Sequence, residues 1–233
     1  MSLRLEPSAA VRERRLAHLL AERGLGRDDP RLVSLVEDAL LVGSLELAGA
    51  PVTWDEARGA GGAMVPPPVL ALRRALRAVA PEERVTLGVV NTWHTALAGP
   101  VGFRRREVAD SGGEIGAPCA FIEDRLSSLF EWLEAAGSAE LQPEQKAAVA
   151  LARLVEIRPF EDANGRVARL AAAHLLARAR LGPPILVGGD GPRLRETLKA
   201  AFRLETGPLV ELIREASGRA LAVMIQSLER GLV

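Results

Sequence analysis

The sequence predicts an all-α bundle that carries one small β-hairpin. Apolar residues recur at helical spacing along most of the 233 residues, a pattern typical of helices that bury one face. Prolines and capping residues mark the starts of many of these segments. Only residues 103–121 lack the helical period, and a Ser-Gly-Gly turn divides them into two short segments, which favours a hairpin or flap.

The composition is that of an ordinary globular protein, with 48% apolar and 26% charged residues, enough to bury a sizeable core. Lys plus Arg and Asp plus Glu each total 30, so the chain lacks the basic excess of nucleic-acid-binding domains. A single cysteine, Cys119, excludes an internal disulfide, and the isolated histidines, at positions 18, 94 and 174, lack metal-ligand spacing. We therefore expect a cytoplasmic protein without a membrane segment, and the sequence leaves its oligomeric state open.

The expected helices follow in chain order. Asp29 and Pro30 form an N-cap and first turn for a helix over residues 30–46, and residues 53–56 read as a capping box that opens a short helix ended by glycines at 59–62. Further helices are expected at residues 70–76, from position 81 or 86 to 97, at 126–133, 143–155 and 167–175, and twice after a loop at 188–192. Three tryptophans lie in apolar helical patterns and are expected in the core, namely Trp54, Trp93 and Trp132.

The hairpin is expected to pair residues 103–108 with residues 115–121 across a turn at 111–113. The arginines at 104–106 would then lie on the flap surface or on a solvated strand face. We divide the chain into an N-terminal helical extension, residues 1–60, and a main domain, residues 61–233, within one compact unit.

The segment over residues 158–169 stands apart because it crowds two acids, an asparagine, a glycine and several arginines at a helix start. A helix start presents free N–H groups and a partial positive charge, so Asn164, Gly165 and Arg166 could wrap a phosphate. Arg169 lies three residues on and shares the face of Arg166, while Asp162 is a hard oxygen ligand suited to Mg²⁺. Spacing alone leaves open the simpler interpretation of a capped helix with solvated arginines.

At these residues the sequence, RPFEDANGRVAR, resembles the Fic (Fido) family motif H-P-F-x-D/E-G-N-G-R-x-x-R. The resemblance implies a helical bundle with a flap, and a nucleotide site that includes Phe160. ATP would be bound with Mg²⁺ on Asp162, its phosphates on Asn164, Gly165 and Arg166, and its terminal phosphate on Arg169. Most members transfer AMP to a protein hydroxyl, and the flap at residues 103–121 would hold the protein target by strand addition.

Two positions depart from the family motif. Arg158 replaces the histidine that serves as general base, and an arginine has no acceptor lone pair and stays protonated near neutral pH. A positioned base commonly contributes 10²- to 10⁴-fold, so its loss predicts impaired transfer. Ala163 replaces a glycine, which is a milder change.

A further resemblance concerns the inhibitory helix of many Fic proteins, S/T-x-x-x-E-G/N, whose glutamate pairs with the second motif arginine. Residues 42–47 read VGSLEL, in which only the glutamate, Glu46, is retained cleanly. An inhibitory Glu46 and a plain exposed glutamate are equal alternatives. Three functions therefore stay open: an impaired Fic protein that binds a nucleotide, an active adenylyltransferase or related transferase with another base, and a non-catalytic interaction module.

Overall fold

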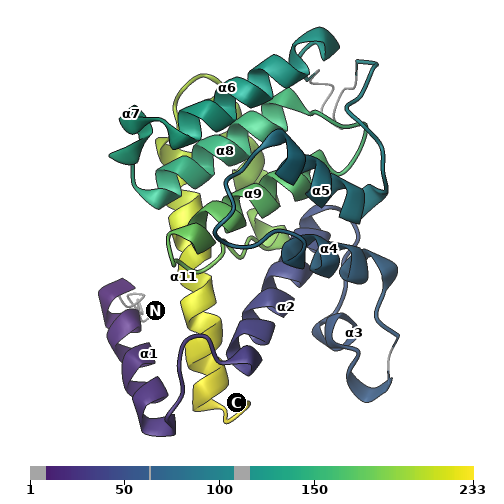
Figure 1. Cartoon of the computed structure of the whole chain (residues 1–233). Helices are drawn as coiled ribbons and strands as arrows, with labels where there is room; N and C mark the ends of the chain where they lie inside the picture. Colours follow the sequence, from purple (N-terminus) through teal and green to yellow (C-terminus); the bar gives the residue numbers. More distant parts are fainter. Residues whose placement is uncertain (1–8, 63, 108–115) are drawn as a thin grey trace.

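The computed structural model describes residues 9–62, 64–107 and 116–233, and every regular element in these ranges is helical (Figure 1). The α-helices are α1 (Ala9–Arg23), α2 (Pro30–Leu47), α3 (Trp54–Arg58), α4 (Pro67–Arg77), α5 (Leu87–Ala98), α6 (Ile122–Glu134), α7 (Ala136–Ala139), α8 (Pro143–Ile157), α9 (Asn164–Arg178), α10 (Gly191–Phe202) and α11 (Gly207–Glu229). Three single-turn 3₁₀ helices are η1 (Ala60–Gly62), η2 (Cys119–Phe121) and η3 (Gly188–Asp190). The all-α prediction is confirmed for these residues.

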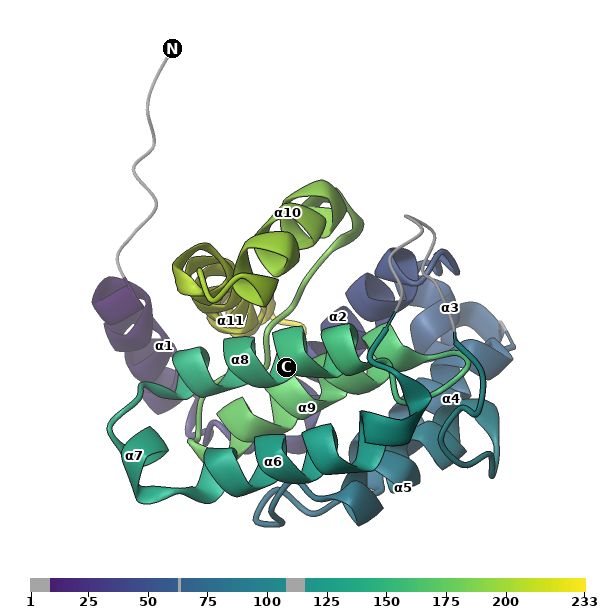
Figure 2. The same ribbon diagram turned by 90° about the horizontal axis from the view of Figure 1, so that it is seen from above.

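Helices α8 and α9 form the centre of the bundle and pack along each other. Seen from above, α8 lies between α6 on one side and the α10–α11 pair on the other (Figure 2). The helical period of the sequence explains this packing, because the apolar positions of both helices are buried. The helix predicted from the motif onward is thus a central element, and its first turn carries the motif residues.

The N-terminal helices are joined to the same body. Helix α1 packs on α11, which also contacts α2 (Figure 1). Leu41 and Leu45 of α2 belong to the main core, while Leu32 packs with Leu16 of α1 and Leu228 of α11. The described residues 9–60 therefore share hydrophobic clusters with the rest of the chain, and our division at residue 60 stays a proposal.

Several predicted helix starts are confirmed by their contacts. Asp29 accepts the backbone N–H of Arg31 at 3.0 Å, and Thr53 and Glu56 form the expected reciprocal capping box. Of the two starts offered for α5, the later one is right, since the hydroxyl of Thr86 accepts the N–H of Val89. These caps stabilise helix ends by satisfying donors that lack a partner inside the helix.

The expected hairpin is not seen, although residues 108–115, which include its turn, lie outside the described ranges. Residues 103–107 and 116–121 form turns and η2, with no strand among them. The physical reason is Arg104, whose backbone N–H donates to the Pro159 carbonyl and whose fully buried side chain donates to the Arg158 and Ala117 carbonyls. Arg104 is therefore neither a flap-surface residue nor part of a solvated strand face.

The tryptophans are divided between core and surface. Trp93 is 2% exposed, as expected, but Trp54 and Trp132 are 41% and 36% exposed, so the core prediction was wrong for these two. None of the helices in the described ranges combines the length and apolar character needed to cross a membrane.

Candidate functional site

The motif loop joins α8 to α9 and has a left-handed residue at each end. Arg158 follows α8 with a φ of 49°, and Ala163 precedes α9 with a φ of 62°. Left-handed backbone costs an L-residue about 1–2 kcal/mol because its Cβ approaches the carbonyl oxygen. This geometry explains why the family motif has glycine where this chain has Ala163, and it leaves the exchange as a source of local strain.

Asn164 closes the loop from the α9 side. Its Oδ1 accepts the backbone N–H of Phe160 at 2.9 Å, and its Nδ2 donates to the Phe160 carbonyl at 2.8 Å. Both ends of the amide are thus engaged by one residue, and the side chain of Asn164 shapes the loop.

Phe160 lies beneath the loop and is fully buried. Its ring stacks on His94 of α5 with centroids 3.7 Å apart, and it packs against Phe103. The side chain therefore offers no surface to a nucleotide in this structure, and it supports the loop from below.

Arg104 ties the preceding segment to the loop. Its backbone N–H donates to the Pro159 carbonyl at 2.9 Å, and its Nε donates to the Arg158 carbonyl at 2.6 Å. The guanidinium also donates to Glu107 and to several further acceptors, which are the carbonyls of Arg106, Ala117 and Ile157 and the sulfur of Cys119. One buried cation thus fixes the loop backbone together with Ala117 and Cys119.

Arg169 lies in the second turn of α9 and is buried beside the start of that helix. Its Nε donates to the hydroxyl of Ser44 at 3.0 Å, and its Nη2 donates to the Ser44 carbonyl at 2.9 Å. A methyl carbon added at Gly165 would lie 3.2 Å from Nη1, so the guanidinium lies close to the first turn. Burial, with the charge of Arg166 as a second cause, lowers the pKa of Arg169 to about 10, which still leaves it protonated at neutral pH.

The start of α9 is electropositive. No acidic residue lies in its first turn and no side chain caps it, while Arg166 is mostly buried there and pairs with Asp162 at 3.2 Å. A helix start already carries a partial positive charge. Arg166 and Arg169 each add a full positive charge beside it. The structure therefore brings four of the predicted residues together, namely Asp162, Gly165, Arg166 and Arg169.

Asp162 fits a magnesium ligand in one respect. The Asp162 side chain is 81% exposed, and its carboxylate faces the start of α9. Mg²⁺ in phosphate sites commonly binds one or two carboxylates together with substrate phosphates. The neighbouring Glu161 pairs with Arg106 at 3.2 Å. Within the described ranges no group of three metal-ligating side chains is present, so the residues suit a phosphate-bound metal and not a protein-only metal centre.

Arg158 occupies the position of the family's histidine. Arg158 is 8% exposed, and its Nε donates to the Val155 carbonyl in the last turn of α8 at 3.3 Å. The guanidinium thus acts as a donor at the helix end, and it has no lone pair with which to accept a proton.

Glu46 does not contact Arg169. Its exposed carboxylate accepts the N–H of Gly188 at 2.7 Å, at the start of η3, and Arg169 instead binds Ser44. Ser44 and Glu46 are two residues apart on α2, so their side chains point to different sides of the helix. Of the two alternatives for Glu46, the structure shows the exposed glutamate without a contact to Arg169. Sequence reasoning missed Ser44 because its hydroxyl matches no motif position.

His94 is a second residue that sequence reasoning did not place in the site. It is 3% exposed, and its Nδ1 is buried with no hydrogen-bond partner in the described part of the chain. Burial lowers the pKa of His94, Arg166 lowers it further and Asp162 acts in the opposite direction. The only sequence signal was a lone histidine on an apolar helical face.

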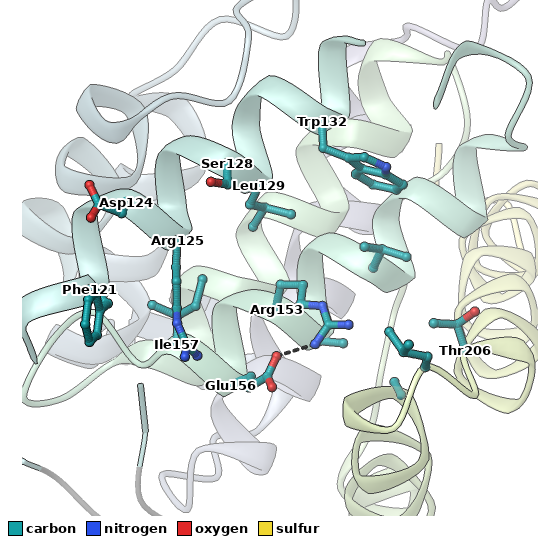
Figure 3. A pocket seen from close by; sticks show the side chains of 14 residues that line it. Phe121, Asp124, Arg125, Ser128, Leu129, Trp132, Arg153, Glu156, Ile157 and Thr206 are labelled. Atoms are coloured by element: carbon teal, nitrogen blue, oxygen red, sulfur yellow. Dashed lines mark hydrogen bonds and ion pairs between the residues drawn. The ribbon is translucent and has the colours of Figure 1, made fainter. Parts of the chain in front are cut away.

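Two cavities of about 760 Å³ lie beside the loop and along α8. One is lined by residues 100–105 and 119–120, Ile122, Glu123 and the motif residue Glu161, so the described part of the expected target surface adjoins the loop. The other lies between α6, α8 and the end of α10, with Arg125 and Trp132 pointing into it and Arg153 paired with Glu156 (Figure 3). Its lining includes Ile157, the residue before the motif.

The fold and the motif thus define a helical protein with an arginine-rich loop at the start of a central helix. Residues 84–176 match the Fic/DOC family model, so this part of the chain is similar to that family. Relatives named "Protein adenylyltransferase Fic" are 34% identical in Culex quinquefasciatus and 33% identical in Drosophila melanogaster, over 119 residues. That alignment covers 51% of this chain and 24% of each relative, so the chain spans about a quarter of their length.

Solved structures show the same fold across nearly the whole chain. A Fic domain containing signaling protein from Bacteroides thetaiotaomicron has a TM-score of 0.77 at 19% identity and covers 95% of this chain and 96% of its own. Fic-1 from C. elegans has a TM-score of 0.75 at 19% identity, over 96% of this chain and 74% of its own. IbpAFic2 covalently tethered to Cdc42 has a TM-score of 0.50 at 14% identity, and the match covers 91% of this chain and 71% of its own.

Proposed function

We propose that the start of α9 binds the phosphates of a nucleotide, and that the protein transfers AMP poorly or not at all. The observation that carries the first part is Arg169, a buried cation with only neutral oxygen partners at an uncapped helix start. Burying a charge without a counter-charge is costly. An anionic ligand at this position would supply the missing counter-charge.

The first-turn N–H groups of residues 164–166 would meet the phosphates, with Arg166 as a charged fork. Arg169 would meet the terminal phosphate, since its Nη1 lies close to Gly165. Asp162 would leave Arg166 and hold Mg²⁺, which would neutralise phosphate charge. ATP with Mg²⁺ is therefore the ligand we propose, and a cytoplasmic location belongs to this proposal.

Impaired transfer follows from Arg158. A target hydroxyl that attacks the α-phosphate must lose its proton, and the donor-only guanidinium cannot take it. Glu161 and Asp162 are carboxylates near the loop, but Glu161 pairs with Arg106 and Asp162 with Arg166. No other described residue of the loop is a base.

An active adenylyltransferase with another base is the second candidate, because the relatives at 32–34% identity carry that name. A protein partner would bind in either case, and the cavity beside Glu161 is the surface we propose for it. The neighbour tethered to Cdc42 supports a protein partner for this fold. An interaction module without nucleotide is the third candidate.

Calorimetric titration with ATP, ADP and AMP, with and without Mg²⁺, tests the proposal. We expect ATP to bind more tightly with Mg²⁺, and Arg166→Ala to weaken ATP binding by roughly 1.5–3 kcal/mol, the value of a hydrogen bond to a charged group. The matched control is Arg105→Ala, which changes an exposed arginine of the preceding segment. Absence of binding at millimolar ligand would reject the nucleotide site and favour the interaction module.

A further inference from the structure

Ser44 and Arg169 lie 125 residues apart in sequence and meet in a buried contact between α2 and α9. Ser44 is 4% exposed and Arg169 is 9% exposed. The hydroxyl and the carbonyl of this one serine accept from Nε and Nη2 of the arginine, at 3.0 and 2.9 Å. Two of the three guanidinium nitrogens are thereby fixed by α2.

The third nitrogen, Nη1, is directed elsewhere. It lies near Gly165 in the first turn of α9, and within the described ranges it donates to no acceptor. The guanidinium is planar, so fixing Nε and Nη2 also fixes the direction of the Nη1 donors. Ser44 thus determines where the free donors of Arg169 point.

The partners on α2 are also uncharged. The helix has three acids, but Glu37 pairs with Arg77, Asp38 with Arg73, and Glu46 with the Gly188 backbone. None of them reaches Arg169, which keeps its full charge. Helix α2 therefore orients this cation without neutralising it, the opposite of what an inhibitory carboxylate would do.

We infer that Ser44 is a positioning residue of the phosphate site, which holds Arg169 ready for the terminal phosphate of a nucleoside triphosphate. This inference rests on the proposed function. An arginine side chain that is ordered before the ligand arrives loses no further conformational entropy when the ligand binds. The binding free energy is then more favourable by the entropy cost that is avoided. The benefit is confined to ligands long enough to reach Arg169, so Ser44 favours ATP over AMP.

Substitution of Ser44 separates positioning from inhibition. Ser44→Ala should lower the affinity for Mg²⁺-ATP about 3- to 10-fold, the range expected when one flexible side chain must be ordered on binding. The affinity for AMP should stay within a factor of two. Ser44→Thr retains the hydroxyl and should restore ATP binding, while Glu46→Ala, an exposed change on the same helix, should leave both affinities unchanged. In an Arg169→Ala background, Ser44→Ala should have no effect.

A second measurement needs no variant. The Nε–H signal of Arg169 in nitrogen-15 spectra should be protected from solvent exchange with and without ATP, because the Ser44 contact persists. A higher ATP affinity in Ser44→Ala, or loss of Nε–H protection on adding ATP, would show that Ser44 competes with phosphate and would overturn the inference. Unchanged ATP affinity would overturn it too, while leaving the nucleotide site intact. If the unmodified protein binds no nucleotide, the proposed function fails and the inference with it.

Discussion

The ring of His94 stacks on the ring of Phe160 at a centroid distance of 3.7 Å with planes 9° apart, so a titratable side chain supports the motif loop from below. The pKa of His94 is lowered, chiefly because the charged form would be buried. Asp162 and Arg166 are the charged groups that act on it, in opposite directions.

This contact predicts a loss of stability in acid. A histidine whose pKa is lower in the folded state binds its proton more readily when unfolded, so stability is full above the unfolded value of about 6.5 and falls as pH drops through that value. The loss continues down to the folded pKa, with a slope of at most about 1.4 kcal/mol per pH unit. Urea unfolding between pH 7.5 and 5 measures this fall in the free energy of unfolding.

His94→Gln removes the titration and should flatten this pH profile. His18→Gln is the matched control, because His18 is exposed at the surface beside Glu22, and it should leave the slope unchanged. If both variants retain the slope of the unmodified protein, the acid loss comes from other groups.

Arg104 predicts a large effect on stability. Arg104→Ala removes a fully buried guanidinium and leaves the carbonyls of Ala117, Ile157 and Arg158 without their donor. Each unsatisfied buried group costs about 1–3 kcal/mol, so we expect a loss of roughly 3 kcal/mol or more in denaturant unfolding. Arg105→Ala, which removes an exposed neighbour, should change stability by less than about 0.5 kcal/mol.

The helices could be predicted from the sequence because their signals are local. The Thr53–Glu56 capping box and the apolar period of α9 depend on residues within a few positions of one another. The motif placed Arg166 and Arg169 on one helix face, and the structure has them there. What could be predicted of the site was the part carried by a single helix start.

The remaining contacts depend on residues far apart in sequence. Arg104 binds carbonyls 53 and 54 residues away, so a side chain holds the described residues of the segment that lacks helical period. Ser44 meets Arg169 only because α2 packs against α9 with that face. Neither contact leaves a periodic or spacing signal, and for this reason a hairpin was expected and the Ser44 contact was not.

Ala163 predicts a stabilising substitution. Its φ of 62° is strained for alanine and free for glycine, so Ala163→Gly should raise stability by about 1 kcal/mol in spite of the added freedom of the unfolded chain. Thermal unfolding measures the change. Ala177→Gly, at an exposed site of α9, should lower stability by roughly 0.5–1 kcal/mol. If both variants change stability in the same direction, Ala163 is not strained.

Arg158 leads to the prediction on chemistry. The unmodified protein should transfer little or no labelled AMP to itself or to lysate proteins, because no lone pair is present at position 158. Arg158→His places an acceptor there, and histidine is among the residues that tolerate the left-handed backbone at this position. Labelling should rise about 10²-fold or more, since a positioned base contributes 10²- to 10⁴-fold.

Arg158→Ala is the control that separates gaining a base from losing a cation. It removes the guanidinium without adding a lone pair, so its labelling should stay at the level of the unmodified protein while ATP binding persists. Equal gains in the alanine and histidine variants would mean that the charge or bulk of Arg158 blocks transfer, and not the absence of a base. Strong labelling by the unmodified protein would establish the active transferase and would make Glu161 and Asp162 the first bases to substitute.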